Sequence, residues 1–236
     1  MASLSPKSAP RSAATPALQS RRLRAAAPWA WVGVALVIGV SCFFRFTTGG
    51  PFGVDVWWHG VAGVTRGSLP YAVAVFFAEI GGGLGAAACA AIVAALLLAI
   101  RRSRDAAAVA TAMLGGVLLS EALKSFALRP RPWDQLYPVH GSSFPSGHSL
   151  GAASLAVSIA LVVAYAPEVS ARITRLTWVL ACAWPLLMMW SRTALHAHWL
   201  SDVLAGGLLG ACVAILSRWL WFRNAPPPTL GRRRTS

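Results

Sequence analysis

The sequence FPSGHS at residues 144–149 is a short polar string between two long apolar segments. Pro145 fixes the backbone, Ser146 is a favoured N-cap residue, and the apolar run that follows continues as a helix. Gly147 lets a ligand approach the main chain closely. The unpaired N–H groups and the positive end of the helix dipole therefore predict an anion site at this helix start. His148 stands beside that site as a candidate proton donor or acceptor.

The chain around this string is strongly apolar. Of its 236 residues, 56% are hydrophobic and only 12% are charged, which is typical of an integral membrane protein. The cysteines lie far apart inside apolar runs and form no CxxC pair, so we interpret them as lipid-buried residues that form neither disulfides nor a metal site. They are Cys42, Cys89, Cys182 and Cys212.

Six apolar runs are long enough to cross a bilayer, and they predict an all-α, polytopic membrane bundle of six transmembrane helices. The second run is long for one straight span, so we expect it to tilt, protrude or break near Gly81-Gly82-Gly83. The predicted spans are 25–44, 70–100, 106–128, 150–165, 176–190 and 199–222.

The expected domain organisation places one six-helix domain at residues 25–222 between two basic cytoplasmic tails, 1–24 and 223–236. The first tail is rich in Ser, Ala, Pro and Arg and is expected to be disordered. A cleaved signal peptide is the alternative for the first apolar run, but the charged region before it is long and no A-x-A site follows. Residues 45–70 are expected to form a mixed loop at the membrane interface.

The net charge of +14 comes from 21 Lys and Arg against 7 Asp and Glu. Because these basic residues are divided among tails and short loops, nucleic-acid binding is not expected. With six spans, 15 of the 21 fall on the side of both termini, so the positive-inside rule places the termini in the cytoplasm and residues 144–149 outside. The six basic residues on the outer side are Arg45, Arg66, Lys124, Arg129, Arg131 and Arg192, and four of them lie in or beside polar motifs.

The first motif on that side runs from Lys124 to Pro132. Lys124 lies near the end of the third predicted span, and Arg131 lies seven residues later in a proline-stiffened loop. Two such cations can reach one phosphate, Arg as a planar fork and Lys as a point charge. The alternative is that Lys124 extends to the interface and pairs with Glu121, one turn earlier.

A further motif joins the last two predicted spans and holds Arg192, His196, His198 and Asp202. His198 and Asp202 are four residues apart, so on a helix they share a face and the carboxylate can orient the imidazole. His198 is therefore the candidate nucleophile or base, and His196 is expected to be a loop or interface residue.

Two histidines and an aspartate also suit a metal ion, which is the main alternative for this motif. The nearby cations Lys124, Arg131 and Arg192 would repel a divalent ion but suit a phosphate. We therefore predict phosphoryl transfer with no metal and no cofactor.

In order and spacing, these motifs resemble the three signature motifs of the type 2 phosphatidic acid phosphatase family, also called the lipid phosphate phosphatases. The resemblance covers residues 124–202, and the six-span layout is similar to the family's bacterial membrane members. It implies that the phosphate oxygens are bound by Lys124, Arg131 and Arg192, with help from Ser146 and the backbone of Gly147.

The same resemblance implies that His198, oriented by Asp202, attacks phosphorus to form a phosphohistidine. His148 would protonate the leaving group, and water would then release inorganic phosphate. The family also includes soluble vanadium haloperoxidases, but the apolar spans argue against that branch.

The expected function is hydrolysis of a phosphomonoester or diphosphate on a membrane lipid, at the outer face of the plasma membrane. Isoprenoid diphosphates, phosphatidic acid, phosphatidylglycerol phosphate and glycolipid phosphates are candidate substrates, with a slight preference for the first because the pocket faces outside. A phosphotransferase and a non-hydrolytic lipid-binding or transport protein remain alternatives. Neither Glu79 nor Glu121 is expected to be catalytic, and no oligomeric state is predicted.

Overall fold

The protein is entirely helical in the residues that the computed structural model describes, 15–47, 49–166 and 169–224. Five of its helices are long and apolar enough to cross a membrane, and the pair α3 and α4 is a sixth candidate, bent by 54°. The expected polytopic helical bundle is therefore confirmed. The helices are α1 (Thr15–Phe46), α2 (Gly53–Ala62), α3 (Leu69–Ile80), α4 (Gly83–Ala99), α5 (Ser103–Ala127), α6 (Gly147–Ala164), α7 (Ala171–Ala194) and α8 (Leu200–Phe222).

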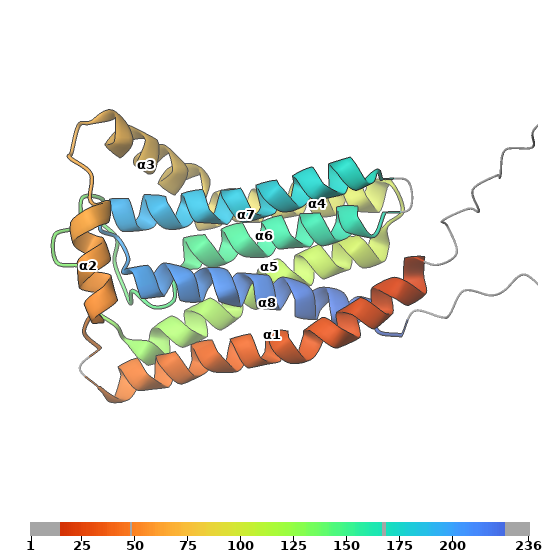
Figure 1. Ribbon diagram of the computed structural model, residues 1–236, viewed down its shortest axis with the longest axis horizontal. Coiled ribbons are helices and arrows are strands. Elements are labelled where there is room, and N and C mark those ends of the chain that lie inside the picture. The colour runs from red at the N-terminus through yellow and green to blue at the C-terminus, as the bar shows by residue number, and fades with distance from the viewer. Residues whose placement is uncertain (1–14, 48, 167–168, 225–236) are drawn as a thin grey trace, which may run out of the picture.

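The second predicted span breaks at its glycines, as expected. α3 ends at Ile80 with Gly81 as its C-cap, α4 begins at Gly83, and α3 leans away from the bundle (Figure 1). A Cβ at Gly81 would lie 1.8 Å from Met188 Cε, and one at Gly85 would lie 2.3 Å from the carbonyl oxygen of Ile80. The contact at Gly85 is with backbone, which cannot move aside, so this position requires glycine, whereas the end of the Met188 side chain can shift.

Two other glycines hold α8 against α6 at the centre of the bundle. A Cβ at Gly206 would lie 2.3 Å from the carbonyl oxygen of Ser146, and one at Gly210 would lie 2.3 Å from that of Leu150. Because the two backbones approach so closely, the start of α6 is fixed relative to the start of α8. These are the two segments that carry the second and third motifs.

All three motifs lie at one end of the bundle, which we call the loop end and define as residues 49–68, 128–146 and 195–199. α1 begins and α8 ends at the opposite end (Figure 1). Helix α2 lies across the loop end, so the predicted mixed loop at residues 45–70 contains a helix. Its first turn is stabilised by Asp55, whose carboxylate accepts a hydrogen bond from the N–H of Phe52 (3.0 Å).

One boundary prediction is wrong. α1 begins at Thr15, so residues 15–24 of the predicted disordered tail are helical and lengthen the first span at the end opposite the motifs. The sequence criterion required large apolar residues, whereas a helix needs only backbone hydrogen bonds and good helix formers such as Ala, Leu and Arg. The remainder of that tail, residues 1–14, and most of the C-terminal tail, residues 225–236, lie outside the described residues.

Candidate active site

The polar string begins α6 as its sequence predicts. Ser146 is the N-cap, and its Oγ accepts a hydrogen bond from the N–H of Ser149 (3.4 Å). The N–H of Ser146 donates to the carbonyl of Asp202 (3.0 Å), which joins this helix start to α8. A Cβ at Gly147 would lie 3.2 Å from Lys124 Nζ, so the glycine lets an ammonium group approach the end of the helix.

Arg192 is the most unusual side chain at the loop end. It lies in the last turn of α7 with 0% exposure, and none of its three guanidinium nitrogens has a hydrogen-bond partner. The ring of Tyr137 covers it, 5.6 Å from the guanidinium carbon. A buried guanidinium without acceptors is very unfavourable, so its environment favours an incoming anion whose oxygens satisfy the free N–H groups.

Arg131 holds the loops around this position. Its guanidinium donates to the backbone carbonyls of Ala197 (2.7 Å), Gly141 (3.0 Å) and Ser142 (3.1 Å). Its Nη1 also lies 3.1 Å from His198 Nε2. Arg131 therefore connects the loop after α5 to the turn before α8 and brings a positive charge beside an imidazole.

The predicted proximity of His198 and Asp202 is found, but the two residues do not share a helix, because His198 lies in the turn before α8. Its Nδ1 is 2.8 Å from the carbonyl oxygen of Ser143 and 3.7 Å from Asp202 Oδ2. Because a carbonyl only accepts, Nδ1 carries the proton, and the lone pair of Nε2 accepts a hydrogen bond from Arg131 Nη1. Burial lowers the pKa of His198 to about 4, and Asp202 only partly opposes this effect, so the ring is neutral at pH 7.

Asp202 is fully buried and organises the loops more than it contacts the imidazole. Its carboxylate accepts hydrogen bonds from the N–H of Trp199 (2.8 Å), from the hydroxyl of Ser143 and from Arg129 Nη1 (2.5 Å). It thereby caps α8 and positions Ser143, whose carbonyl holds His198. It therefore acts on the imidazole both through Ser143 and directly, with its Oδ2 3.7 Å from Nδ1.

Arg129 and Asp55 form a part of the site that sequence reasoning missed. Both side chains have 0% exposure, and Arg129 Nη2 donates to Asp55 Oδ2 at 2.7 Å. Arg129 thus links α2 to Asp202 and α8. The sequence offered only weak signals for this pair. Arg129 was one of six basic residues on the predicted outer side, where the positive-inside rule expects few, and Asp55 was an acidic residue in a mixed loop.

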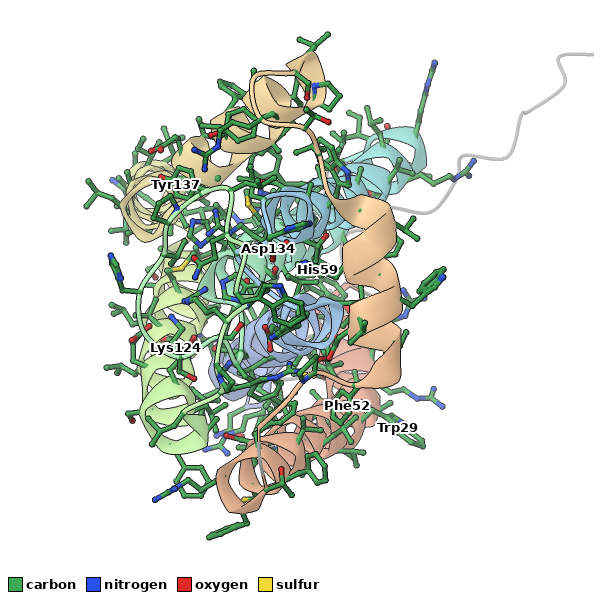
Figure 2. The ribbon with its side chains drawn as sticks, turned by 90° about the vertical axis from the view of Figure 1, so that its left-hand side faces the viewer. Trp29, Phe52, His59, Lys124, Asp134 and Tyr137 are labelled. Atoms are coloured by element: carbon green, nitrogen blue, oxygen red, sulfur yellow. The ribbon has the colours of Figure 1, made fainter. Side chains whose placement is uncertain are left out.

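Lys124 lies at the rim of the site. Its Nζ is 2.7 Å from Glu121 Oε1, which confirms the pairing considered as its alternative role. Both residues line a cavity of about 270 Å³ together with Arg131. Lys124 comes from α5 on the opposite side of the loop end from α2 (Figure 2). Its ammonium group is therefore placed to contact a ligand that enters this cavity.

His148 lies in the first turn of α6, next to the break between α3 and α4, where a Cβ at Gly82 would lie 3.9 Å from its Nε2. An apolar cavity of about 500 Å³ adjoins the same break and is lined by α4, α6 and α7, including Gly81, Gly151 and Trp184. Glu79, near the end of α3, accepts a hydrogen bond from the hydroxyl of Tyr137 (2.5 Å). A polar, cationic region and an apolar cavity thus lie side by side.

The comparisons with known proteins concern the family and the fold. The model of the PAP2 superfamily matches residues 105–226. An undecaprenyl-diphosphatase from Sulfolobus acidocaldarius is 31% identical over 93 residues, which are 39% of this chain and 37% of that protein. The chain therefore spans little more than a third of that curated relative.

Two solved structures share the fold. One is a transmembrane PAP2-type phosphatidylglycerolphosphate phosphatase from Bacillus subtilis, with a TM-score of 0.69 and 22% identity over 80% of this chain and 94% of the other. The second is Aquifex aeolicus LpxE, with a TM-score of 0.56 and 22% identity over 70% of this chain and 95% of the other.

Proposed function

Because the chain belongs to the PAP2 superfamily, we propose that it hydrolyses a phosphomonoester or diphosphate of a membrane lipid. The observation that carries this proposal is the buried guanidinium of Arg192, whose three nitrogens have no partner. A phosphate group supplies the oxygens that they lack. The apolar cavity beside His148 supports a lipid substrate, because a hydrocarbon tail can lie there while the phosphate meets the cations.

In the first step, the lone pair of His198 Nε2 attacks phosphorus and the bond to the leaving oxygen breaks. Arg131, Arg192 and Lys124 bind the phosphoryl oxygens, together with the start of α6 at Ser146 and Gly147. His148 gives its proton to the leaving oxygen. The neutral state of His198 supports its role as nucleophile, since only an unprotonated nitrogen can attack, and Arg131 must exchange its hydrogen bond to Nε2 for one to the phosphate.

In the second step, water attacks the phosphohistidine and His148 accepts the proton of that water. Inorganic phosphate leaves, and His198 regains its lone pair. Asp202 acts by positioning Ser143, whose carbonyl fixes the imidazole. No metal ion is required in this scheme, because three cationic side chains already neutralise the phosphoryl charge.

An isoprenoid diphosphate is our preferred substrate, supported by the relative that is an undecaprenyl-diphosphatase. Phosphatidic acid, phosphatidylglycerol phosphate and glycolipid phosphates are the comparison substrates. The decisive assay measures phosphate release from this panel by purified protein in detergent with a chelator. His198→Ala is expected to abolish turnover, while Arg45→Met, at an exposed position at the end of α1, keeps it near wild type. An active His198→Ala would refute the mechanism, and turnover that is lost on chelation while the protein stays folded would refute its metal independence.

The role of His148 is tested by comparing two substrates whose leaving groups differ in their need for a proton. General acid catalysis contributes about 10²- to 10⁴-fold, and it matters least when the leaving group needs no proton. His148→Asn is therefore expected to lose most turnover of a lipid phosphomonoester but far less of p-nitrophenyl phosphate. Equal losses of turnover on both substrates would show that His148 is not the general acid. Transfer of labelled phosphate to an acceptor alcohol instead of water would identify a transferase.

The active site is proposed to face outward from a plasma membrane, with the termini inside. This orientation is tested with single cysteines in a cysteine-free background, one replacing exposed His140 at the loop end and one replacing Arg223 at the other end. An impermeant thiol reagent added to intact cells should label the first only. Labelling of the second cysteine alone would show that the orientation is the opposite one.

A further inference from the structure

Three side chains from separate segments meet at the loop end, apart from the phosphate-binding residues. His59 comes from the last turn of α2, Asp134 from the loop after α5, and His196 from the turn after α7. One ligand-type atom from each lies within 4.8 Å of the other two. Figure 2 shows His59 and Asp134 side by side near the middle of this face. We propose that this cluster binds a single Zn²⁺ ion.

The distances suit such an ion. His59 Nε2 lies 3.0 Å from Asp134 Oδ1, and His196 Nδ1 lies 3.0 Å from Asp134 Oδ2. In a tetrahedral zinc site with bonds of about 2.0–2.2 Å, neighbouring ligand atoms are about 3.4 Å apart. Both imidazole–carboxylate distances are within a few tenths of an ångström of that spacing, and the two imidazole nitrogens lie within 4.8 Å of each other. Two imidazoles and one carboxylate leave the fourth position for water, because Asp134 is exposed to solvent.

The backbone brings these segments together without help from the ligands. The N–H of Leu136 donates to the carbonyl of Leu195 (3.0 Å), and the N–H of Val64 donates to the carbonyl of Ala194 (3.4 Å). These bonds join the loop after α5 and the end of α2 to the end of α7. The three ligands are therefore arranged in advance, which lowers the cost of binding an ion.

Hydrogen bonding alone does not account for His196. Its backbone has a φ of +52°, a left-handed conformation that L-residues rarely adopt. Its Nε2 is buried without a partner and packs against Gly63, where a Cβ would lie 2.5 Å away. In this strained conformation, and with Nε2 unpaired, Nδ1 points toward Asp134 and His59. Coordination of an ion by Nδ1 would offset the energetic cost of this conformation.

This site differs from the metal alternative considered for the third motif. That alternative grouped His196 with His198 and Asp202, whereas in the structure His196 pairs with Asp134, and Asp202 pairs with Arg129. The proposed ion does not contact the phosphate. However, His196 lies two residues before His198, and Asp134 lies three residues after Arg131. Zinc would therefore stabilise the loops that carry these residues, and its binding does not depend on the proposed phosphatase activity.

Zinc binding is measured directly by calorimetry on protein purified without a histidine tag and freed of metal by a chelator. Co²⁺, whose visible absorption reports a four-coordinate site, serves as a second probe. We expect one ion per chain, and a higher unfolding temperature with zinc than without it. Asp134→Asn and His59→Asn should each weaken binding at least about 100-fold, since even altering a residue behind a ligand costs about 10- to 100-fold.

Two control variants locate the ion. His140→Asn removes an exposed histidine outside the cluster, and His198→Ala removes the imidazole of the phosphate pocket; both should bind zinc like the wild type. Loss of binding in His198→Ala, unchanged binding in Asp134→Asn and His59→Asn, or no binding by the wild type would each overturn the proposal. The two ligand variants lie in different segments, and unfolding of each is followed without zinc. A folding defect in one therefore leaves the other as a valid test.

Discussion

Replacing Arg129 with methionine should destabilise the protein strongly. Its guanidinium lies between Asp55 and Asp202, at N–O distances of 2.7 and 2.5 Å, and all three side chains have 0% exposure. Methionine fills much of the same space but removes the charge, so two carboxylates remain buried without a cation. Removing one partner of a buried ion pair costs about 3–5 kcal/mol, because the other charge stays desolvated.

The assay is thermal unfolding in detergent, followed by the fluorescence of the 11 tryptophans. For a chain of this size, about 3–5 kcal/mol corresponds to a decrease in Tm of about 6–20 °C. Arg45→Met, at an exposed position at the end of α1, is the matched control and should change stability by less than about 0.5 kcal/mol. Asp55→Asn combined with Arg129→Met should be less destabilised than the sum of the single changes. If Arg129→Met unfolds within about 1 kcal/mol of the wild type, this network does not hold α2 to α8.

Four further predictions concern packing and the pocket. Gly210→Ala should lower the free energy of unfolding by about 1–3 kcal/mol in a thermal unfolding assay, because its Cβ would lie 2.3 Å from the carbonyl oxygen of Leu150. Gly115→Ala is the control: nothing lies within 4 Å of its Cβ, so it should be neutral or slightly stabilising. Gly147→Ala should raise KM more than it lowers kcat in steady-state assays, since its Cβ would crowd Lys124 Nζ. Glu121→Gln should lower KM by up to about fivefold by freeing Lys124, the effect of an exposed pair worth at most about 1 kcal/mol. Burial lowers the pKa of His198 from 6.5 to about 4. Between these pH values the unfolded chain binds a proton that the folded chain does not, so the free energy of unfolding should fall as the pH decreases from 6.5 to about 4. In the presence of a chelator, His198→Gln should show a smaller decrease in Tm over the same pH range.

The sequence was sufficient for features that depend on local patterns. Apolar length predicted the spans, the glycine run predicted the break between α3 and α4, and the serine before Gly147 predicted the start of α6. Each of these follows from residues within a few positions of one another. The helix at residues 53–62 and the early start of α1 were missed, since neither depends on a long apolar run.

Contacts between distant segments were not predictable in the same way. Arg129 meets Asp55 across 74 residues, and His59 meets Asp134 across 75. No local periodicity relates such pairs, because their proximity results from how α2 crosses the loop end. The spacing of His198 and Asp202 predicted their proximity for the wrong reason: it assumed one continuous helix, whereas α8 begins at Leu200 and the pair at 3.7 Å is formed across the turn. A chain turn between two residues removes the geometry that helical spacing implies.

The separation of His198 from Asp202 has a chemical consequence for the proposed reaction. A carboxylate in direct contact with Nδ1 would stabilise the imidazolium and so reduce the supply of the neutral nucleophile. The carbonyl of Ser143 fixes the same tautomer without a full negative charge, and Arg129, which also pairs with Asp55, partly offsets the charge of Asp202. As the bond from Nε2 to phosphorus forms, positive charge develops on the ring, and Asp202 at 3.7 Å from Nδ1 is close enough to stabilise it. Asp202 therefore acts more strongly on the transition state than on the resting imidazole, which is the condition for an interaction to accelerate the chemical step.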